Sequence, residues 1–212
     1  MEWLSQYSAS ITALTSIATL FVWVFYAQIL YRNFARTRRP RIIINRGHGN
    51  GTSAYCLISN MSSEPIFVQE ILTTLGTHSG EFVEDMIDCE VKPDAEANDG
   101  NQMWSRQGPM SSGGFHHLDT FENIIERICR ANGLQLRSRD HEEGVVPEFL
   151  DIRVIAIYGS EDQPIGARRR FSLHPDSHGQ CLLIPTSLDT KRYANRYRRW
   201  RVRRWMKALD DV

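Results

Sequence analysis

Charged residues are almost absent from the first 31 positions of this chain. Glu2 is the only charged side chain there, and the 29 residues from Trp3 to Tyr31 include no Asp, Glu, Lys, Arg or His. A helix over that stretch, rising about 1.5 Å per residue, spans roughly 43 Å, more than the roughly 30 Å of a hydrocarbon core. Buried helices of water-soluble proteins seldom stay apolar on every side for so long. We therefore predict a transmembrane helix over residues 9–31.

Positive charge is missing before this segment and concentrated directly after it. A cleavable signal peptide needs basic residues before a shorter apolar run and a small-residue cleavage site after it, so we expect an uncleaved anchor. Residues 32–46 hold six Arg and no acid. The positive-inside rule then predicts a short extracytoplasmic N-terminus (1–8), a basic juxtamembrane linker (32–40) and a cytoplasmic domain. We expect the membrane to be a bacterial inner membrane.

The predicted membrane helix carries a stripe of small hydroxylated side chains. Their spacings of 3, 4, 3 and 4 match the heptad spacing of paired helices, and small side chains let helices approach closely in lipid. Alternatively, each hydroxyl bonds to a carbonyl of its own helix. No ionisable residue in the span supports an ion pathway. We predict that a homo-oligomer forms through this hydroxyl stripe, which consists of Ser5, Ser8, Thr12, Thr15 and Thr19.

The net formal charge of zero hides a strong segregation of charge. Residues 191–207 hold nine Lys or Arg and no acid, whereas residues 64–190 hold ten Lys or Arg against 22 Asp or Glu. An anionic cytoplasmic leaflet attracts the basic segments and repels the acidic body. We therefore expect contact with anionic lipid headgroups from Arg32, Arg36, Arg38, Arg39, Arg196, Arg199, Trp200, Arg203 and Trp205.

The segment 189–212 mixes Arg with Tyr and Trp, and we predict that it forms a basic aromatic helix. Arginine and aromatic rings suit a membrane surface, where the cation meets phosphate and the ring lies at the boundary. The same mixture suits nucleic acid, or docking against an acidic partner or the acidic body of the protein itself. Because the chain is already tethered, we favour the bilayer surface and do not expect nucleic acid as a partner.

Signatures of the common catalytic classes are absent. No P-loop, nucleophile elbow or zinc-protease motif occurs, and the four cysteines form no CxxC pair, so we expect reduced, mostly buried thiols. His116, His117 and Asp119 are the densest group of possible metal ligands, but adjacent residues in an extended segment point to opposite sides. Asp119 is better explained as a helix cap. We expect no catalytic site, no cofactor and no metal; a third ligand would have to come from His141, His174 or His178.

Short apolar runs separated by turn residues predict a mainly β domain over residues 41–188. One helix should begin at Asp119 and end at Asn132-Gly133, and residues 92–114 read as a long loop. The run Arg168-Arg169-Arg170 suggests a solvated edge or a contact with an acidic partner. We predict an antiparallel immunoglobulin-like β-sandwich with one inserted helix. Its expected strands lie at 41–46, 54–59, 66–75, 81–91, 149–158, 170–173 and 181–185, with a helix as the alternative at 81–91.

Together these features predict a single-pass membrane-anchored protein whose cytoplasmic β-sandwich serves as an interaction or scaffolding module. We expect it to self-associate and to have no catalytic activity. The alternative is an accessory or regulatory subunit of a multi-component membrane complex, such as a transporter, a channel or a defence system.

Overall fold

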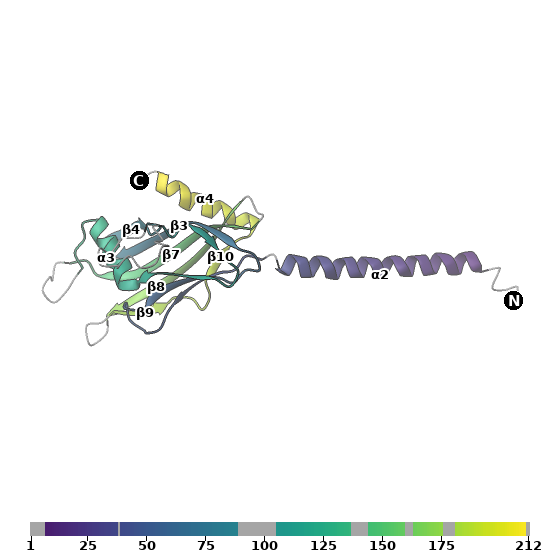
Figure 1. Ribbon diagram of the computed structural model, residues 1–212, viewed down its shortest axis with the longest axis horizontal. Coiled ribbons are helices and arrows are strands. Elements are labelled where there is room, and N and C mark those ends of the chain that lie inside the picture. Colours follow the sequence, from purple (N-terminus) through teal and green to yellow (C-terminus); the bar gives the residue numbers. More distant parts are fainter. Residues whose placement is uncertain are drawn as a thin grey trace, which may run out of the picture. The chain divides into compact units, whose positions relative to one another are not determined.

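The chain divides into two compact units, Met1–Arg39 and Pro40–Val212. The computed structural model describes residues 7–37, 39–88, 105–136, 144–159, 163–175 and 181–210. The first unit contains helix α2 (Ser8–Thr37), and the second contains strands and two further helices (Figure 1). The elements of the second unit are β1 (Ile42–Arg46), β2 (Tyr55–Asn60), β3 (Ile66–Thr77), β4 (Gly80–Asp85), β5 (Gly108–Met110), β6 (Phe115–Thr120), α3 (Phe121–Ala131), β7 (Pro147–Tyr158), β8 (Pro164–Pro175), β9 (Cys181–Pro185), β10 (Lys191–Tyr193) and α4 (Arg196–Asp210).

Helix α2 continues past the predicted end at residue 31 and includes Arg32. Its stretch Ser8–Ala35, 28 residues long, is apolar and long enough to cross a membrane, as an anchor or as a signal sequence. None of its most apolar window is buried against other parts of the described chain. Apolar side chains on all sides, without protein cover, distinguish this helix from the core helix of a globular domain.

The second unit contains two antiparallel sheets, as predicted. The small sheet has the strand order β1-β2-β6, and the large sheet has the order β10-β8-β7-β3-β4. Strand β5 pairs with β3, and β9 pairs with β8. The apolar strand β7, which was predicted over residues 149–158, lies between β3 and β8. A bulge between Val68 and Glu70 interrupts the register of β3.

One apolar core joins the two sheets and α3. Ile44 and Ile58 of the small sheet and Ile152 and Val154 of β7 are fully buried in it. Burial of a side chain of this size contributes about 1.5–3 kcal/mol, so this core is the main source of stability. As predicted, α3 adds an apolar face to the core, made of Phe121, Ile124, Ile125 and Ile128.

The start of α3 differs from the prediction by one residue. The cap is Thr120, whose hydroxyl accepts a hydrogen bond from the Asn123 backbone N–H at 3.2 Å. The Asp119 carboxylate instead accepts bonds from the Thr120 N–H and the Asn123 side-chain amide, both at 2.7 Å. Strand β6 runs directly into the helix, so its last residue serves as the cap. The end at Asn132 agrees with the prediction.

Three strands form where none was predicted. Strand β5 lies in the predicted loop 92–114, β6 precedes α3, and β10 lies in the segment predicted as the C-terminal helix, which begins only at Arg196. Each pairs with a strand that is distant in sequence: β5 with β3, β6 with β2 and β10 with β8.

Strand β8 is an interior strand, which corrects the expectation of a solvated edge at Arg168-Arg169-Arg170. It pairs with β7 along one side and with β9 and β10 along the other. Arg169 points to the core side and is only 8% exposed, whereas Arg168 and Arg170 lie on the opposite face.

Helix α4 covers part of the face of the large sheet that is turned away from the small sheet (Figure 1). Val202 of α4 is buried together with Leu72, Ile155 and Tyr193. The helix approaches closely because β8 has a glycine beneath it: a Cβ at Gly166 would lie 2.8 Å from side-chain atoms of Val202 and Trp205. The second unit therefore has three layers: small sheet, large sheet and α4.

Candidate functional site

Helix α4 has two faces with different surroundings. On the face toward the large sheet, the Trp205 ring lies edge to face with Tyr193, with 4.8 Å between ring centroids. The Arg153 guanidinium lies 5.6 Å from the Trp205 ring, and Arg199 donates from Nε to the Ala194 carbonyl at 2.8 Å. The apolar side of this helix is thus docked on its own domain, which was one of the alternatives for the segment. Trp205, predicted to contact the membrane, is half-buried in this docking contact.

The opposite face of α4 is exposed and combines cations with aromatic rings. Tyr197 is 90% exposed and Trp200 is 51% exposed. The guanidinium groups of Arg201 and Arg204 lie 5.8 and 5.5 Å from the Trp200 ring. Cations held beside an exposed ring suit an anionic surface with an apolar layer below it. We call this set the basic aromatic face: Tyr197, Trp200, Arg201, Arg203, Arg204 and Lys207.

The other residues predicted to contact the membrane surface lie in or near α2 and at the start of α4. Arg32 on α2 and Arg39 after it are exposed. Arg36 lies in α2 and Arg196 is the first residue of α4, while Arg38 lies outside the described residues.

The three threonines of the hydroxyl stripe donate their hydroxyl hydrogen bonds within α2. Thr12, Thr15 and Thr19 each donate to the carbonyl four residues earlier, at 2.8 Å. Ser8 begins the helix, and Ser5 lies outside the described residues. In the single chain, these threonines therefore follow the alternative in which each hydroxyl bonds to a carbonyl of its own helix. Association through the stripe stays a prediction and would depend on close packing of small side chains rather than on hydroxyl donors.

A buried carboxylate surrounded by arginines lies on the outer face of the large sheet. Asp151 is fully buried and accepts from Arg153 at 2.9 Å and from Arg168 at 2.8 Å, and the Arg170 guanidinium lies 3.9 Å away. The Arg170 guanidinium also lies 3.8 Å from the Phe149 ring centroid. Three cations around one carboxylate give this cluster a net formal charge of +2.

Strand alternation explains how this cluster forms. Residues two apart in a strand point to the same face, so Asp151 and Arg153 of β7 lie together, as do Arg168 and Arg170 of β8. The hairpin register places Asp151 opposite Arg170 and Arg153 opposite Arg168. The period-two charge pattern was a signal for this cluster, but it was missed because the register between the strands was unknown.

The edge strand β1 is held by side chains from β8 and from the segment just before β10. The Ile44 N–H donates to the Thr190 hydroxyl at 3.0 Å, and the Ile44 carbonyl accepts from Arg169 Nη1 at 2.7 Å. Arg169 also donates to the Asn45 side chain and, at 3.2 Å, to the Leu188 carbonyl. Burial lowers the pKa of Arg169, and the nearby charge of Asp189 opposes this shift.

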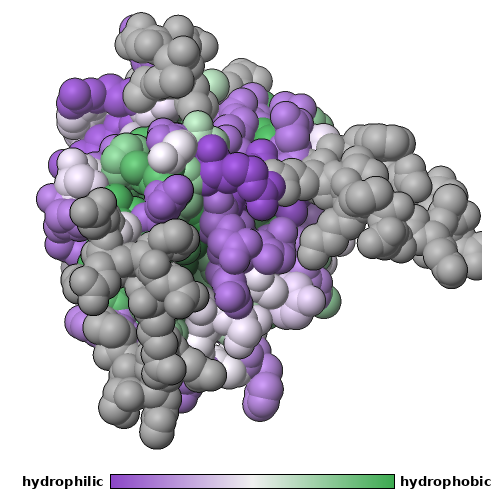
Figure 2. Space-filling view, turned by 90° about the vertical axis from the view of Figure 1, so that its left-hand side faces the viewer, coloured by the Kyte–Doolittle hydropathy of each residue, from purple (hydrophilic) through white to green (hydrophobic). Residues whose placement is uncertain are grey.

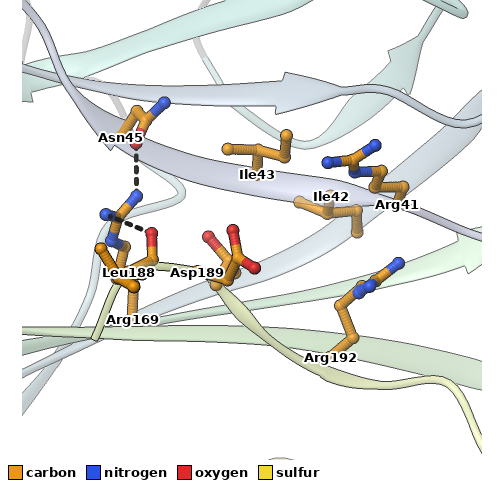
Figure 3. Close-up of a pocket in the computed structure, with 9 residues that line it drawn as sticks. Arg41, Ile42, Ile43, Asn45, Arg169, Leu188, Asp189 and Arg192 are labelled. Atoms are coloured by element: carbon orange, nitrogen blue, oxygen red, sulfur yellow. Dashed lines mark hydrogen bonds between the residues drawn. The ribbon is translucent and has the colours of Figure 1, made fainter.

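A small pocket lies beside this contact, with a volume of about 140 Å³ (Figure 3). Its walls come from β1, from β8 and from the segment leading into β10, and Arg41 and Arg192 lie on the same side of it. We call it the β1 pocket; its polar and charged lining consists of Arg41, Asn45, Arg169, Asp189, Thr190 and Arg192. No local sequence pattern predicted it, because residues about 150 positions apart have to meet.

The described cysteines are not suited to nucleophilic or redox chemistry. Cys56, Cys129 and Cys181 are free thiols, as predicted, and Cys89 lies outside the described residues. Burial raises the pKa of Cys56 to about 12 and also raises the pKa of Cys129 and of Cys181. The reactive thiolate is therefore scarce at neutral pH.

The histidines considered as metal ligands are separated by the strand geometry. His116 and His117 are adjacent in β6 and point to opposite sides. The His117 ring packs edge to face against Tyr55 at 5.6 Å, and burial lowers the pKa of His116. Within the described residues, no three His, Cys, Asp or Glu side chains gather to hold an ion. His174 is exposed, and two further candidates lie outside the described ranges: His141 and His178.

Comparison with known proteins supplies no relative for this chain. No family model, no curated protein and no solved structure matches it. Its function therefore has to be inferred from the residues and their arrangement.

Replacing Asp151 by Asn should destabilise the domain. The change removes the only negative charge among three guanidinium groups, and loss of one partner from a buried ion cluster costs about 3 kcal/mol or more. Chemical denaturation of the full chain in detergent, followed by circular dichroism, measures the change in unfolding free energy. Glu148→Gln is the matched control, because Glu148 is an exposed acid in the same strand. Equal stability of the two variants would contradict a structural role for the cluster.

Proposed function

We propose that this chain is a single-pass membrane-anchored interaction or scaffolding protein. The observation that carries the proposal is the 28-residue apolar helix without protein cover, followed directly by arginines. The positive-inside rule favours an N-terminus outside and a cytoplasmic domain, at a bacterial inner membrane. Hydrophilic residues cover much of the face of the second unit in Figure 2, as is typical of a surface exposed to water.

The basic aromatic face of α4 is proposed to contact anionic lipid headgroups. Val202 and Trp205 pack on the large sheet, so among the α4 side chains that the structure describes, the exposed rings of Tyr197 and Trp200 are available to enter the apolar boundary. Four cations on the same face, Arg201, Arg203, Arg204 and Lys207, supply the attraction. The contact should therefore be shallow, mainly electrostatic and weakened by salt.

The two sheets are proposed to have an immunoglobulin-like arrangement, which suits a binding module without a catalytic centre. Support comes from the strand order: β1, β2 and β6 match strands A, B and E of that architecture. The order β8-β7-β3-β4 matches strands G, F, C and C′ of the second sheet. Helix α3 then occupies the connection between the sixth and seventh strands.

Membrane topology is the first test of this proposal. Leu4→Cys should react with a membrane-impermeant maleimide on intact cells, whereas Ser53→Cys should react only after permeabilisation. The unmodified chain gives the background, which should be low because burial suppresses its described thiols. The reverse labelling pattern would contradict the orientation. A shortened chain that leaves the membrane fraction after an alkaline wash would show a signal sequence instead of an anchor.

Oligomeric state tests the scaffolding role. The full chain purified in mild detergent should be a homo-oligomer by light scattering, and Thr15→Leu combined with Thr19→Leu should weaken association at least tenfold, because bulk on the stripe keeps helices apart. Ser10→Leu combined with Ala13→Leu adds at least as much bulk to the other side of α2 and should have little effect. A different protein that co-purifies in fixed ratio would instead identify an accessory or regulatory subunit.

Vesicle binding tests the basic aromatic face. A fragment of residues 40–212, a compact unit with its own core, should sediment with phosphatidylglycerol vesicles at low salt and not with phosphatidylcholine vesicles. One interfacial cation is worth about 1 kcal/mol, so Arg204→Gln should weaken binding roughly fivefold. Lys191→Gln removes the same charge from an exposed position outside α4 and should change binding less than twofold. Equal losses would contradict a specific contact through α4.

A further inference from the structure

Two arginines of the β1 pocket lack an acidic partner. Within the described residues, the guanidinium groups of Arg41 and Arg192 form no ion pair, although both side chains line the same pocket. Asp189 is the only acid in the lining, and its charge acts on the buried Arg169. Three arginines and one aspartate give the lining a formal charge of +2. This excess of positive charge favours an anion.

The backbone of β1 adds a donor on the same side. The Arg41 carbonyl accepts from the Met61 N–H at 2.8 Å, so Arg41 faces β2. In an antiparallel ladder the next residue points its N–H and carbonyl the other way, and Ile42 therefore turns them away from β2. Ile44 does the same, but its two groups are taken by Thr190 and Arg169. The N–H of Ile42, a pocket-lining residue, is left on the pocket side.

The size of the pocket restricts the ligand. A volume of about 140 Å³ holds roughly five water molecules, well below the volume of about 300 Å³ or more that a metabolite-sized ligand needs. A compact oxyanion fits this space. Guanidinium groups match the oxygens of phosphate in pairs, with stronger hydrogen bonds than neutral donors provide.

We propose that the β1 pocket binds a phosphate group, held by the guanidinium groups of Arg41 and Arg192 and by the Ile42 N–H. An anionic phospholipid headgroup and a free phosphate share this chemistry. Arg41 follows the last residue of α2, Thr37, by four residues, at most about 14 Å of chain. For an anchored chain, headgroups are therefore within reach of the pocket. The inference that the phosphate group belongs to a lipid rests on the proposed membrane anchoring. The inference that the pocket binds a phosphate group does not.

Titration of the full chain in neutral maltoside micelles tests the proposal with two probes. Inorganic phosphate and short-chain phosphatidylglycerol are titrated separately, and isothermal calorimetry gives each dissociation constant. Arg41→Gln and Arg192→Gln should each weaken binding at least tenfold. Lys191→Gln, which removes the same charge from the residue next to Arg192, should change it less than twofold, because Lys191 does not line the pocket. Both arginines are exposed, so their replacement should leave the fold intact.

Each outcome of this titration decides a point. Binding of both probes, weakened by the arginine variants, supports a site for the phosphate group itself. Binding of phosphatidylglycerol alone assigns the site to a lipid headgroup, and binding of inorganic phosphate alone assigns it to a soluble ligand. Binding of neither probe, or an equal loss with Lys191→Gln, overturns the proposal. Since no bilayer is used, a failure of membrane insertion in the labelling experiment would be seen separately.

Discussion

The pairing of β7 with β3 on one side and β8 on the other is the interaction on which the rest of the domain depends. The β3 ladder runs from Ile66 opposite Tyr158 to Thr77 opposite Pro147. With neighbours on both edges, β7 presents alternate side chains to two different environments. Val154 enters the core shared with the small sheet, whereas Ile155 meets α4. Asp151 lies on the same outer face as Ile155, where the arginines of β7 and β8 pair with its carboxylate.

The docking of α4 decides which of its residues are available to partners. Because Gly166 has no side chain, Val202 and Trp205 can approach the sheet closely. This contact fixes the rotation of α4 about its axis. Rotation then determines that Tyr197 and Trp200 face outward among cations. A segment whose sequence mixes Arg with Tyr and Trp thus becomes a helix with one side packed on the sheet and one side available for binding. The β1 pocket is a second basic feature of the same unit, built from a different set of elements.

Local sequence patterns predicted the elements whose apolar residues repeat with the period of a helix or form a short apolar run. The apolar spacing of α3 and the apolar runs of β1, β2, β3 and β7 led to the correct elements. Strand β10 carries no such pattern: Lys191 and Arg192 are exposed, and the strand forms because Tyr193 pairs with Gly166 of β8.

Charge was harder to place than apolar character. The three consecutive arginines were expected to be solvated, yet the middle one, Arg169, is buried. Its guanidinium group donates hydrogen bonds to carbonyls of β1 and of the segment before β10. Those acceptors are distant in sequence, so only the tertiary structure selects which arginine is buried. The β1 pocket was unpredictable for the same reason, since Arg41 and Arg192 line one pocket only in the tertiary structure.

The hydrogen bonds of Thr190 and Arg169 to the Ile44 backbone affect how copies of this protein can interact on a membrane. An exposed strand edge offers a template on which another chain can add a strand, which leads to aggregation. Copies tethered to a bilayer, as we propose for this chain, meet at high effective concentration, so that such additions would be frequent. Here the central N–H and carbonyl on the free side of β1 are already bonded within the molecule. These bonds hinder strand addition at the middle of this edge, so we expect controlled assembly to use other surfaces of the protein.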